Sequence, residues 1–445
     1  MFRKLVSILL VLVLSLSLCS FASAQAIPEG RRVVEFWHCF GGVIGDAMLA
    51  TVNAFNESQD KIFVNATFQG SYDDTLTKLK AALPAGTGPD VFQMFELGTC
   101  FLANTDYYVP YQDLLEKDPY ISIDDIEGVL RNYYTVNGKM VCIPINPSSP
   151  IMYYNKTAFD KAGITEIPKT FDEIAAIAEQ LTSVEGNPKY AFAPFIYGWF
   201  FENFLTGMSA YYVNNENGHA DIATEIDFDK NGAGKAILEK WKELVDNGVI
   251  FNFGAGSTGS DGAKASFMAG ESAIILQSTA QLTTITGGAD FEVGCAYLPR
   301  IAGEEFQGVT IGGANLWIVK NPEEQRVQDA WEFVKFATSA EMSAKFSMAT
   351  GYFAANTKAY EMDFYVEYLK QNPNAQVALN QLHDSPKTNV TAGSNVGVMT
   401  DLRANFEQVM ELYLQGAYTT EEALAEMATL DNEAIAYYNK TVYNK

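Results

Sequence analysis

One segment of the chain begins with the spacing of a calcium-binding loop. Residues 227–238 start with two aspartates and an asparagine at alternate positions, followed by a glycine. Such a loop also needs a glutamate at its twelfth position, which binds the ion through both oxygens. The ninth position here is Lys235 and the twelfth is Leu238. The segment therefore predicts a turn that caps a helix, and not a metal site.

Histidine and cysteine offer no better case for a metal or a cofactor, and we expect neither. The histidines are far apart and not at metal-ligand spacings: His38, His219 and His383. Beyond residue 24 the cysteines form no C-x-x-C pair: Cys39, Cys100, Cys142 and Cys295. Two states stay open for them, because an exported protein can form disulfides and buried free thiols are equally ordinary.

Hydroxyl groups in a proline-broken segment are better placed to meet a ligand. The segment Pro144–Lys156 has the composition of a strand, interrupted by three prolines and by Ser148 and Ser149. Each proline fixes φ and lacks a backbone donor, so the first half is not expected to be a central strand. We expect extended chain without full pairing there, then a strand at Ile151–Tyr154. Such a segment suits a crossing between two lobes, with a serine facing the ligand.

Strands that alternate with helices must position these groups. Strands are expected over 33–37, 62–68 and 91–95, separated by helices. This alternation predicts an α/β fold with βαβ units and mixed, mainly parallel sheets. Thr170 and Thr419 are each followed three residues later by glutamate, as in capping boxes that begin helices. The expected helices are 47–56, 75–83, 171–181, 234–247, 261–268, 323–337 and 420–438.

Length, charge and the N-terminus narrow the class of protein. A chain of 445 residues predicts two domains, and a net charge of −24 argues against binding nucleic acid or an anionic membrane. Residues 1–24 have the features of a signal peptide: basic residues, a short apolar run and an Ala-Ser-Ala cleavage site. We expect export to the periplasm or the cell surface. Cys19 offers the alternative of a lipid anchor, although Leu18 stands where lipoprotein signals normally have a small residue.

Separate motifs, in order along nearly the whole mature chain, together resemble one family. They are Phe36-Trp37-His38, Gly70-Ser71-Tyr72, Phe95–Thr99, Asn146–Asn155, Gly198-Trp199, Glu202–Phe204, Gly312–Trp317, Thr350–Tyr352 and Met399–Arg403. The chain resembles the extracellular solute-binding proteins of ABC importers, of the maltose-binding-like type. Within that family the motifs are most similar to members that bind glycerol phosphates.

The resemblance implies a two-lobe, Venus-flytrap fold of the type II class, with the ligand held between the lobes. One lobe is expected to comprise residues 27–145 and 295–352, and the other 146–294 and 353–445. The chain would cross between them near 146–150, near 298–300 and after 352. No motif implies an oligomeric state, and we expect a monomer that delivers its ligand to a membrane permease.

The resemblance also implies a set of ligand-binding residues. They are Tyr72, Glu96, Ser148, Trp199, Ser278, Gly313, Tyr352 and Arg403. Tyr72 and Glu96 correspond to residues at the hydroxyl end of the ligand, and Trp199 to a wall of the pocket. The other five correspond to residues around the phosphate, with Ser149 a bystander. Three positions depart from the family pattern, since Ile196 replaces a second wall tryptophan, Ala354 replaces a proline and Cys39 replaces a serine.

Charge and hydrogen bonding make this set suitable for glycerol 3-phosphate or a glycerophosphodiester. Arg403 offers a planar fork for phosphate, whereas Glu96 suits hydroxyls and is expected at the opposite end. A neutral mono- or oligosaccharide is the alternative ligand, and it is expected to leave Arg403 unpaired at a cost of several kcal/mol. A secreted glycosidase or phosphodiesterase is a third hypothesis, but no metal spacing supports it. We expect a binding protein and not an enzyme.

Overall fold

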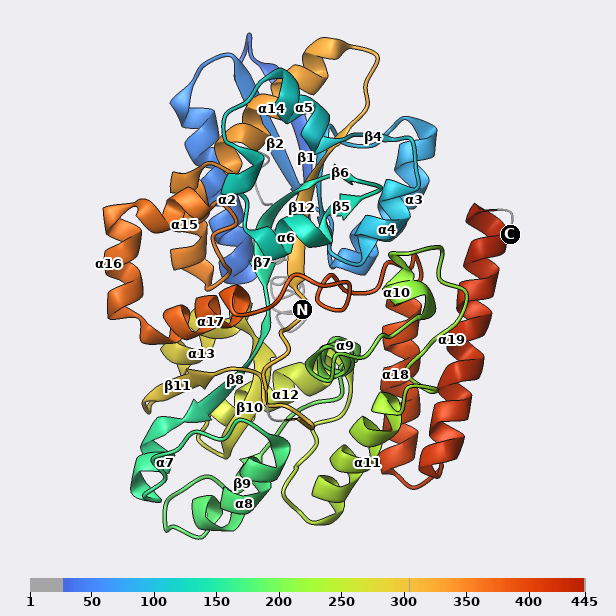
Figure 1. Cartoon of the computed structure of the whole chain (residues 1–445). Helices are drawn as coiled ribbons and strands as arrows, with labels where there is room; N and C mark the ends of the chain where they lie inside the picture. The colour runs from blue at the N-terminus through green and yellow to red at the C-terminus, as the bar shows by residue number, and fades with distance from the viewer. Residues whose placement is uncertain (1–26, 304, 444–445) are drawn as a thin grey trace, which may run out of the picture.

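Two β-sheets, each flanked by helices, form the centres of the upper and lower halves of the molecule in Figure 1. This computed structural model describes residues 27–303 and 305–443, so the expected signal peptide and Cys19 lie outside the described residues. Between the two halves the chain passes directly from β7 to β8, two consecutive strands that belong to different sheets. The mixed α/β class with two sheets is confirmed.

The upper sheet has the strand order β2-β1-β3-β12-β4, and β7 also pairs with β12. Its strands are β1 (Arg32–His38), β2 (Ile62–Phe68), β3 (Val91–Phe95), β4 (Tyr108–Val109), β7 (Ile143–Ser148) and β12 (Gly312–Val319). The strands β1, β2 and β3 run parallel, whereas β12 is antiparallel to all three of its neighbours. Parallel strands end at the same edge of a sheet, and ligands bind beyond that edge in such folds. The residue that follows β3 therefore lies at the edge where a ligand is expected.

The lower sheet has the order β11-β8-β10-β9. Its strands are β8 (Pro150–Asn155), β9 (Tyr190–Phe192), β10 (Ser272–Ser278) and β11 (Val293–Ala296). A hairpin of β5 (Thr135–Val136) and β6 (Lys139–Met140) stands apart from both sheets. Antiparallel pairings outnumber parallel ones among the described strands, so the expected predominance of parallel pairing is wrong. The reason is that β8 and β12 enter their sheets from crossing segments and pair antiparallel with every neighbour.

Helices cover the upper sheet and extend to the boundary between the halves. They are α2 (Gly42–Ser58), α3 (Tyr72–Ala85), α4 (Gly98–Ala103), α5 (Tyr111–Lys117), α6 (Gly128–Tyr133), α14 (Glu324–Ala337) and α15 (Ala340–Thr350), with the 3-10 turns η1 (Ile123–Asp125) and η3 (Thr357–Glu361). Contacts of α14 with β1, β12 and α2 place it against this sheet. The helices α16 (Asp363–Gln371) and α17 (Pro373–His383) continue from α15 to β11 of the lower sheet.

The lower half is richer in helices. They are α7 (Lys156–Lys161), α8 (Phe171–Thr182), α9 (Gly198–Gly207), α10 (Asn214–Gly218), α11 (Ala233–Asp246), α12 (Gly256–Met268), α13 (Leu282–Gly288), α18 (Met399–Leu414) and α19 (Thr420–Val442), with the 3-10 turn η2 (Thr279–Gln281). The long helices α18 and α19 pack against each other at the lower right of Figure 1, where α11 contacts both. The apolar helix α9 is buried over nearly its whole length, and it packs against both α11 and α18.

Most predicted elements are confirmed, and the capping residues act as expected. Thr170 and Thr419 each accept a hydrogen bond from the backbone N–H three residues later, and Thr419 also has the reciprocal bond of a capping box, whereas Glu173 accepts from Lys169 and not from Thr170. The strands expected over 62–68 and 91–95 have those bounds, but α12 begins at Gly256 and not at residue 261. The calcium-like segment is a capping turn, because the Asn231 side chain accepts from the backbone of Ala233, where α11 begins.

The proline-broken segment is an edge strand followed by a central strand. The strand β7 pairs with β12 alone among the described strands, and the pairing is irregular between Ala314 and Asn315. This one-sided pairing explains how Pro144 and Pro147 are accommodated, since an edge strand can leave N–H positions unused. Pro150 is the first residue of β8, another position that tolerates proline. The three crossings and the residue bounds of the two lobes stay predictions.

Of the alternatives left open for cysteine, the structure shows the unpaired one. Cys39, Cys100, Cys142 and Cys295 are free and buried. Burial raises the pKa of Cys39 and Cys100 to about 12, so these thiols are not reactive thiolates at neutral pH. No metal-ligating cluster of three or more side chains occurs among the described residues. Across the same part of the chain, no helix is both long and apolar enough to cross a bilayer.

Candidate functional site

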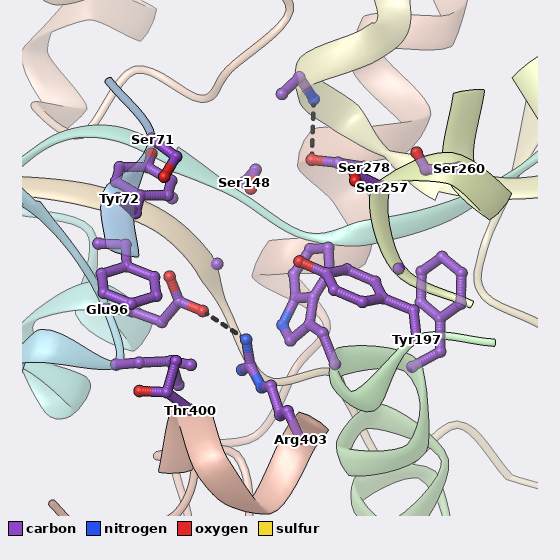
Figure 2. Close-up of a pocket in the computed structure, with 18 of the residues that line it drawn as sticks. Ser71, Tyr72, Glu96, Ser148, Tyr197, Ser257, Ser260, Ser278, Thr400 and Arg403 are labelled. Atoms are coloured by element: carbon purple, nitrogen blue, oxygen red, sulfur yellow. Dashed lines mark hydrogen bonds and ion pairs between the residues drawn. The ribbon is translucent and has the colours of Figure 1, made fainter. Parts of the chain in front are cut away.

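The eight predicted ligand-binding residues all line a single cavity of about 680 Å³ between the two sheets. Strands of the upper sheet contribute Ser148 and Gly313, and Glu96 follows β3. The lower half contributes Ser278 at the end of β10 and Trp199 and Arg403 from helices. Figure 2 shows Tyr72, Glu96 and Ser148 on one side of this cavity, with Tyr197, Ser278 and Arg403 opposite. The structure therefore brings the predicted set together, while ligand contact by each residue stays a prediction.

Arg403 is the centre of a buried cluster of charges. Its Nη1 lies 3.0 Å from Oε1 of Glu96, and its Nη2 lies 2.6 Å from Oε2 of Glu202. Its Nε also donates to Glu202, at 3.2 Å. All three side chains are at most 8% exposed. Burial opposes the charge of the guanidinium, but Glu202 and Glu96 outweigh it and raise the pKa of Arg403. Arg403 is thus a permanent cation held by two carboxylates.

Glu96 is the weaker of the two carboxylate partners. Burial raises the pKa of Glu96 to about 6, against the opposing effect of Arg403. It makes one hydrogen bond to the guanidinium, whereas Glu202 accepts two. Glu96 lines the cavity, and Glu202 does not. Glu96 is therefore the partner that a ligand can replace.

This geometry corrects two expectations. Glu96 and Arg403 are not at opposite ends of the site but contact each other, because a buried guanidinium requires countercharge and both carboxylates are within reach. The cost expected for binding a neutral sugar is also wrong. Arg403 is not unpaired in the cavity, so charge by itself does not exclude an uncharged ligand.

Aromatic rings form much of the cavity wall. Tyr72 stacks on Phe95 with ring centroids 4.9 Å apart and planes 9° apart. Trp199 donates from Nε1 to the backbone carbonyl of Ile311 at 3.3 Å, which fixes its ring against β12. Tyr197 lies 6.1 Å from the Trp199 ring at a steep angle. These rings offer apolar faces to carbon atoms of a ligand, while the polar end of Trp199 is already bonded to the backbone of Ile311.

Glycines at two places allow backbones to approach closely. Gly313 has φ +97°, and a Cβ there would lie 2.0 Å from the carbonyl oxygen of Asn146. Gly198 begins α9, and a Cβ there would lie 2.4 Å from Cβ of Arg403. The absence of a side chain at Gly198 therefore lets α9 meet α18 and brings Trp199 and Arg403 into the same wall.

The hydroxyl groups are positioned by strand ends. Ser148 ends β7 and lines the cavity, whereas Ser149 is buried and accepts a hydrogen bond from Gln381 Nε2 at 3.0 Å. The placement of Ser148 in the cavity and of Ser149 outside it is confirmed. Ser278 lines the cavity, and its hydroxyl accepts from the backbone N–H of Ala280 at 3.2 Å.

Several lining residues were not predicted from the sequence. Aromatic and hydroxyl groups missed in this way are Phe95, Phe195, Tyr197, Phe200, Ser257, Ser260 and Thr400. The missed carboxylates are Asp73, Asp401 and Glu407. Tyr197 directly precedes the motif Gly198-Trp199, and Asp401 lies within the motif Met399–Arg403, which is the signal that could have identified them. Ser257 and Ser260 lie on α12, whose glycine-rich start gave no such signal.

Two of the departures from the family pattern, Ile196 and Cys39, have different structural consequences. Ile196 is fully buried, lies outside the cavity lining, and donates its N–H to the carbonyl of Gly254. The neighbouring Tyr197 provides an aromatic ring in the wall instead. Cys39 is buried, and its N–H donates to Oε1 of Gln93 at 3.0 Å. Neither departure removes a group from the cluster around Arg403.

Two sheets with a cavity between them, lined from both sides, define a protein that encloses a small solute. Residues 50–376 match the family of bacterial extracellular solute-binding proteins, and the chain belongs to this family. Members bind a solute outside the cytoplasm and supply an ABC importer. The chain is 29% identical over 420 residues to the sn-glycerol-3-phosphate-binding periplasmic protein of Yersinia pseudotuberculosis, covering 92% of this chain and 93% of that protein. Identity to the protein of the same name from Salmonella typhimurium is 27% over 438 residues, covering 96% and 97%.

Solved structures of the same fold include binding proteins for phosphodiesters and for sugars. UgpB from Mycobacterium tuberculosis in complex with glycerophosphocholine has a TM-score of 0.75 at 23% identity, covering 93% of this chain and all of that one. The cyclic α-maltosyl-1,6-maltose binding protein from Arthrobacter globiformis has a TM-score of 0.72 at 22% identity, with coverage of 92% and 100%. At these identities the likeness shows the type II periplasmic-binding-protein fold and does not select the ligand.

Proposed function

We propose that this solute-binding protein captures a glycerophosphodiester between two lobes and delivers it to a membrane permease. The lobes are those expected from the sequence, residues 27–145 with 295–352 and residues 146–294 with 353–445. A ligand that contacts both lobes stabilises the closed form, which is the form a permease recognises in this class. We further propose a monomer outside the cytoplasmic membrane that binds its solute without chemically changing it.

The observation that carries the proposal is the exchangeable bond between Glu96 and Arg403. A phosphodiester oxygen can take the place of Glu96 on Nη1 of Arg403 while Glu202 continues to hold the other side of the guanidinium. Glu96 is then free to accept hydrogen bonds from the glycerol hydroxyls. The relatives named for binding sn-glycerol 3-phosphate support this choice of ligand.

The remaining predicted residues fit the parts of such a ligand. Ser148, Ser278 and Tyr352 offer hydroxyl donors from both halves, and Gly313 offers backbone with no side chain in the way. Tyr72 and Trp199 provide ring faces for the glycerol carbons. Hydroxyl donors from both halves can hold a phosphate only when the two halves are close, so the same contacts couple binding to closure.

The charge of the cavity favours a diester over a monoester. Glu96 is accompanied by three further lining carboxylates, Asp73, Asp401 and Glu407, and Arg403 is the single Lys or Arg among the described lining residues. A phosphate monoester carries close to two negative charges at neutral pH, whereas a diester carries one. A diester whose alcohol is cationic has no net charge, and its ammonium group suits the acidic side chains. We therefore propose glycerophosphocholine-like compounds ahead of glycerol 3-phosphate.

A neutral oligosaccharide is the second candidate. The observation in its favour is that Arg403 already has its charge balanced by Glu96 and Glu202, beside a wall of stacked rings. Carboxylates and ring faces are the groups that hold sugar hydroxyls and sugar carbons. If this protein binds maltose and binds neither phosphate compound, the second candidate replaces the first.

Titration calorimetry with glycerophosphocholine, glycerol 3-phosphate and maltose tests the proposal. We expect glycerophosphocholine to bind most tightly at pH 7.5. Its affinity should rise as the pH falls through about 6, because protonated Glu96 releases Arg403. The Glu96→Gln variant should bind it about ten-fold more tightly at pH 7.5 and lose this pH dependence.

The matched control is Glu407→Gln, which removes a carboxylate from the same cavity. Glu407 accepts a hydrogen bond from the Gly198 N–H at 3.0 Å and makes no ion pair with Arg403. We expect a smaller gain in affinity than for Glu96→Gln and a retained pH dependence. Equal gains from the two variants would show that general charge matters and that exchange on Arg403 does not.

A further inference from the structure

A second cavity of about 690 Å³ adjoins the first at Glu96 and Leu97, which line both. It lies between α4 and the β5–β6 turn on one side and α10 and the end of α19 on the other, at the right of Figure 1. The segment 389–399, which leads into α18, closes it from the third side. None of the eight predicted ligand-binding residues except Glu96 lines this cavity.

Asparagine side chains give this second cavity its character. Six of them line it, and five of these donate the amide N–H₂ to another protein group. The pairs are Asn104 with Cys100 O at 2.7 Å, Asn132 with Thr388 O at 3.4 Å, Asn389 with Glu216 Oε2 at 2.7 Å, Asn395 with Gly218 O at 3.1 Å and Asn439 with Ala223 O at 2.7 Å. Because the amide nitrogens are held in this way, the amide oxygens have fixed directions, and none of them accepts a hydrogen bond from a described residue. The cavity is therefore lined with oriented acceptors.

Three buried hydroxyl groups beside these amides have no hydrogen-bond partner among the described residues. They are Oγ1 of Thr99, Oγ of Ser394 and the phenolic hydroxyl of Tyr438, on residues no more than 8% exposed. A buried hydroxyl without a partner lowers stability, so a partner supplied by a ligand stabilises the complex. These hydroxyls can both donate and accept, which complements the amide oxygens around them.

Charge is nearly absent from the cavity lining. No Lys or Arg lines it within the described part of the chain, and its carboxylates are Glu96 at the shared wall and the exposed Asp221. Burial lowers the pKa of His219, so its ring is neutral at pH 7. An ion therefore has little to attract it here, whereas a group that carries many hydroxyls meets acceptors and donors on every side.

We propose that this amide-lined cavity is a second binding site, for an uncharged group rich in hydroxyls, such as a polyol or a sugar ring. Such a group can come from the alcohol end of a phosphodiester held at Arg403, since the two cavities share Glu96 and Leu97, or from a separate polyol molecule. The first source rests on the proposed function, and the second does not.

The test compares glycerophosphoinositol, glycerophosphocholine and free myo-inositol by calorimetry and by saturation-transfer NMR. The double variant Asn104→Ala/Asn395→Ala removes two acceptors, and Ala220→Trp fills the cavity from an exposed lining position. We expect both to weaken the binding of the inositol compound by about ten-fold or more and to leave glycerophosphocholine within about two-fold.

Asn372→Ala is the matched control. Asn372 follows the last turn of α16 as Asn104 follows that of α4, and its amide also donates to the carbonyl four residues earlier, at 2.8 Å. It lies outside both cavities. A loss of affinity in Asn372→Ala equal to that in Asn104→Ala/Asn395→Ala would show that the loss follows from weakened helix ends, and would overturn the proposal.

The outcomes separate the site from the proposed function. If only the diester responds to Ala220→Trp, the polyol group enters as part of the solute; if free myo-inositol also responds, the site binds polyols independently. Failure of both diesters to bind, with a myo-inositol signal that Ala220→Trp abolishes, would refute the proposed function and support the second site. If neither inositol compound responds to Ala220→Trp, the second site is refuted.

Discussion

The two cavities that meet at Glu96 have similar volumes and opposite chemistry. The first is organised around the Arg403 guanidinium, with Glu96 and Glu202 in contact and aromatic rings as its wall. The second is lined by asparagine amides and hydroxyls, and no Lys or Arg lines it within the described residues. Buried charges must be paired with each other, whereas amides can be oriented by backbone carbonyls alone. The first cavity is therefore fixed by ion pairs, and the second by hydrogen bonds of its asparagine amides, most of which also join residues far apart in the sequence.

Removal of Arg403 is expected to have the largest effect. The Arg403→Ala variant leaves Glu96 and Glu202 buried without countercharge, which should lower the free energy of unfolding by about 3–5 kcal/mol. The variant should also lose phosphate binding, so the buried cluster predicts the loss of both binding and stability. Urea unfolding followed by circular dichroism measures the change.

A triple variant distinguishes charge from packing in this cluster. Adding Glu96→Gln and Glu202→Gln to Arg403→Met removes every charge of the cluster at similar volume. We expect it to recover most of the stability lost in Arg403→Met, because no unpaired charge remains. If the triple variant is as unstable as the single one, packing holds this region and the comparison with the second cavity loses its basis.

A buried carboxyl without a cation gives the next largest effect. Asp431 on α19 is 1% exposed, and its one hydrogen bond comes from Nδ2 of Asn405 at 2.9 Å. Burial raises the pKa of Asp431 to about 7, far above that of an exposed aspartate. The stability that this group contributes is present below about pH 4 and is lost as the pH rises through 7.

The Asp431→Asn variant removes this titration at nearly constant shape. We expect the free energy of unfolding of this variant to exceed that of the unchanged protein by about 1–3 kcal/mol at pH 8 and to equal it near pH 4. Urea midpoints across this range measure the change. A difference that does not depend on pH would mean that Asp431 does not titrate in the folded protein.

The order of elements and the residues of the first cavity could largely be predicted, and specific physical reasons explain the rest. Local signals sufficed for the capping of α8 by Thr170 and for the strands β2 and β3. The motif resemblance assigned residues as far apart in the sequence as Glu96 and Arg403 to one site, and both line the first cavity. Their direct contact was missed, because it depends on how α9 and α18 meet at Gly198.

The second cavity could not be predicted, since its chemistry has no sequence signature. Asparagines in loops and at helix ends usually serve as turn or capping residues, and nothing in their spacing indicates a common cavity. Only the folded chain places Asn104, Asn395 and Asn439 around one space. The parallel character of the sheets was overestimated for a related reason, because β8 and β12 pair with strands far away in the sequence.

An ion pair remote from both cavities supplies the smallest expected effect and a baseline for the others. Nε2 of His383 lies 2.9 Å from Oε1 of Glu127, between α17 and the start of α6. The hydrogen bond to Glu127 raises the pKa of His383 above its usual value, against the effect of burial and with a further contribution from Asp384. The stabilisation is therefore present below about pH 6.5 and is lost as the pH rises through the folded pKa. The His383 side chain is 45% exposed, so solvent screening limits its contribution to less than about 1 kcal/mol.

The His383→Gln variant should accordingly be slightly less stable than the unchanged protein at pH 5.5 and equal to it at pH 8.5. The opposite trend is expected for Asp431→Asn, whose advantage grows over the same range. Combining His383→Gln with Glu127→Gln in a double-mutant cycle isolates the pair from other titrating groups. A coupling above about 1 kcal/mol at pH 5.5 would mean that a half-exposed pair matters as much as buried ones. In that case burial would not be what distinguishes the cluster around Arg403 from other charged contacts.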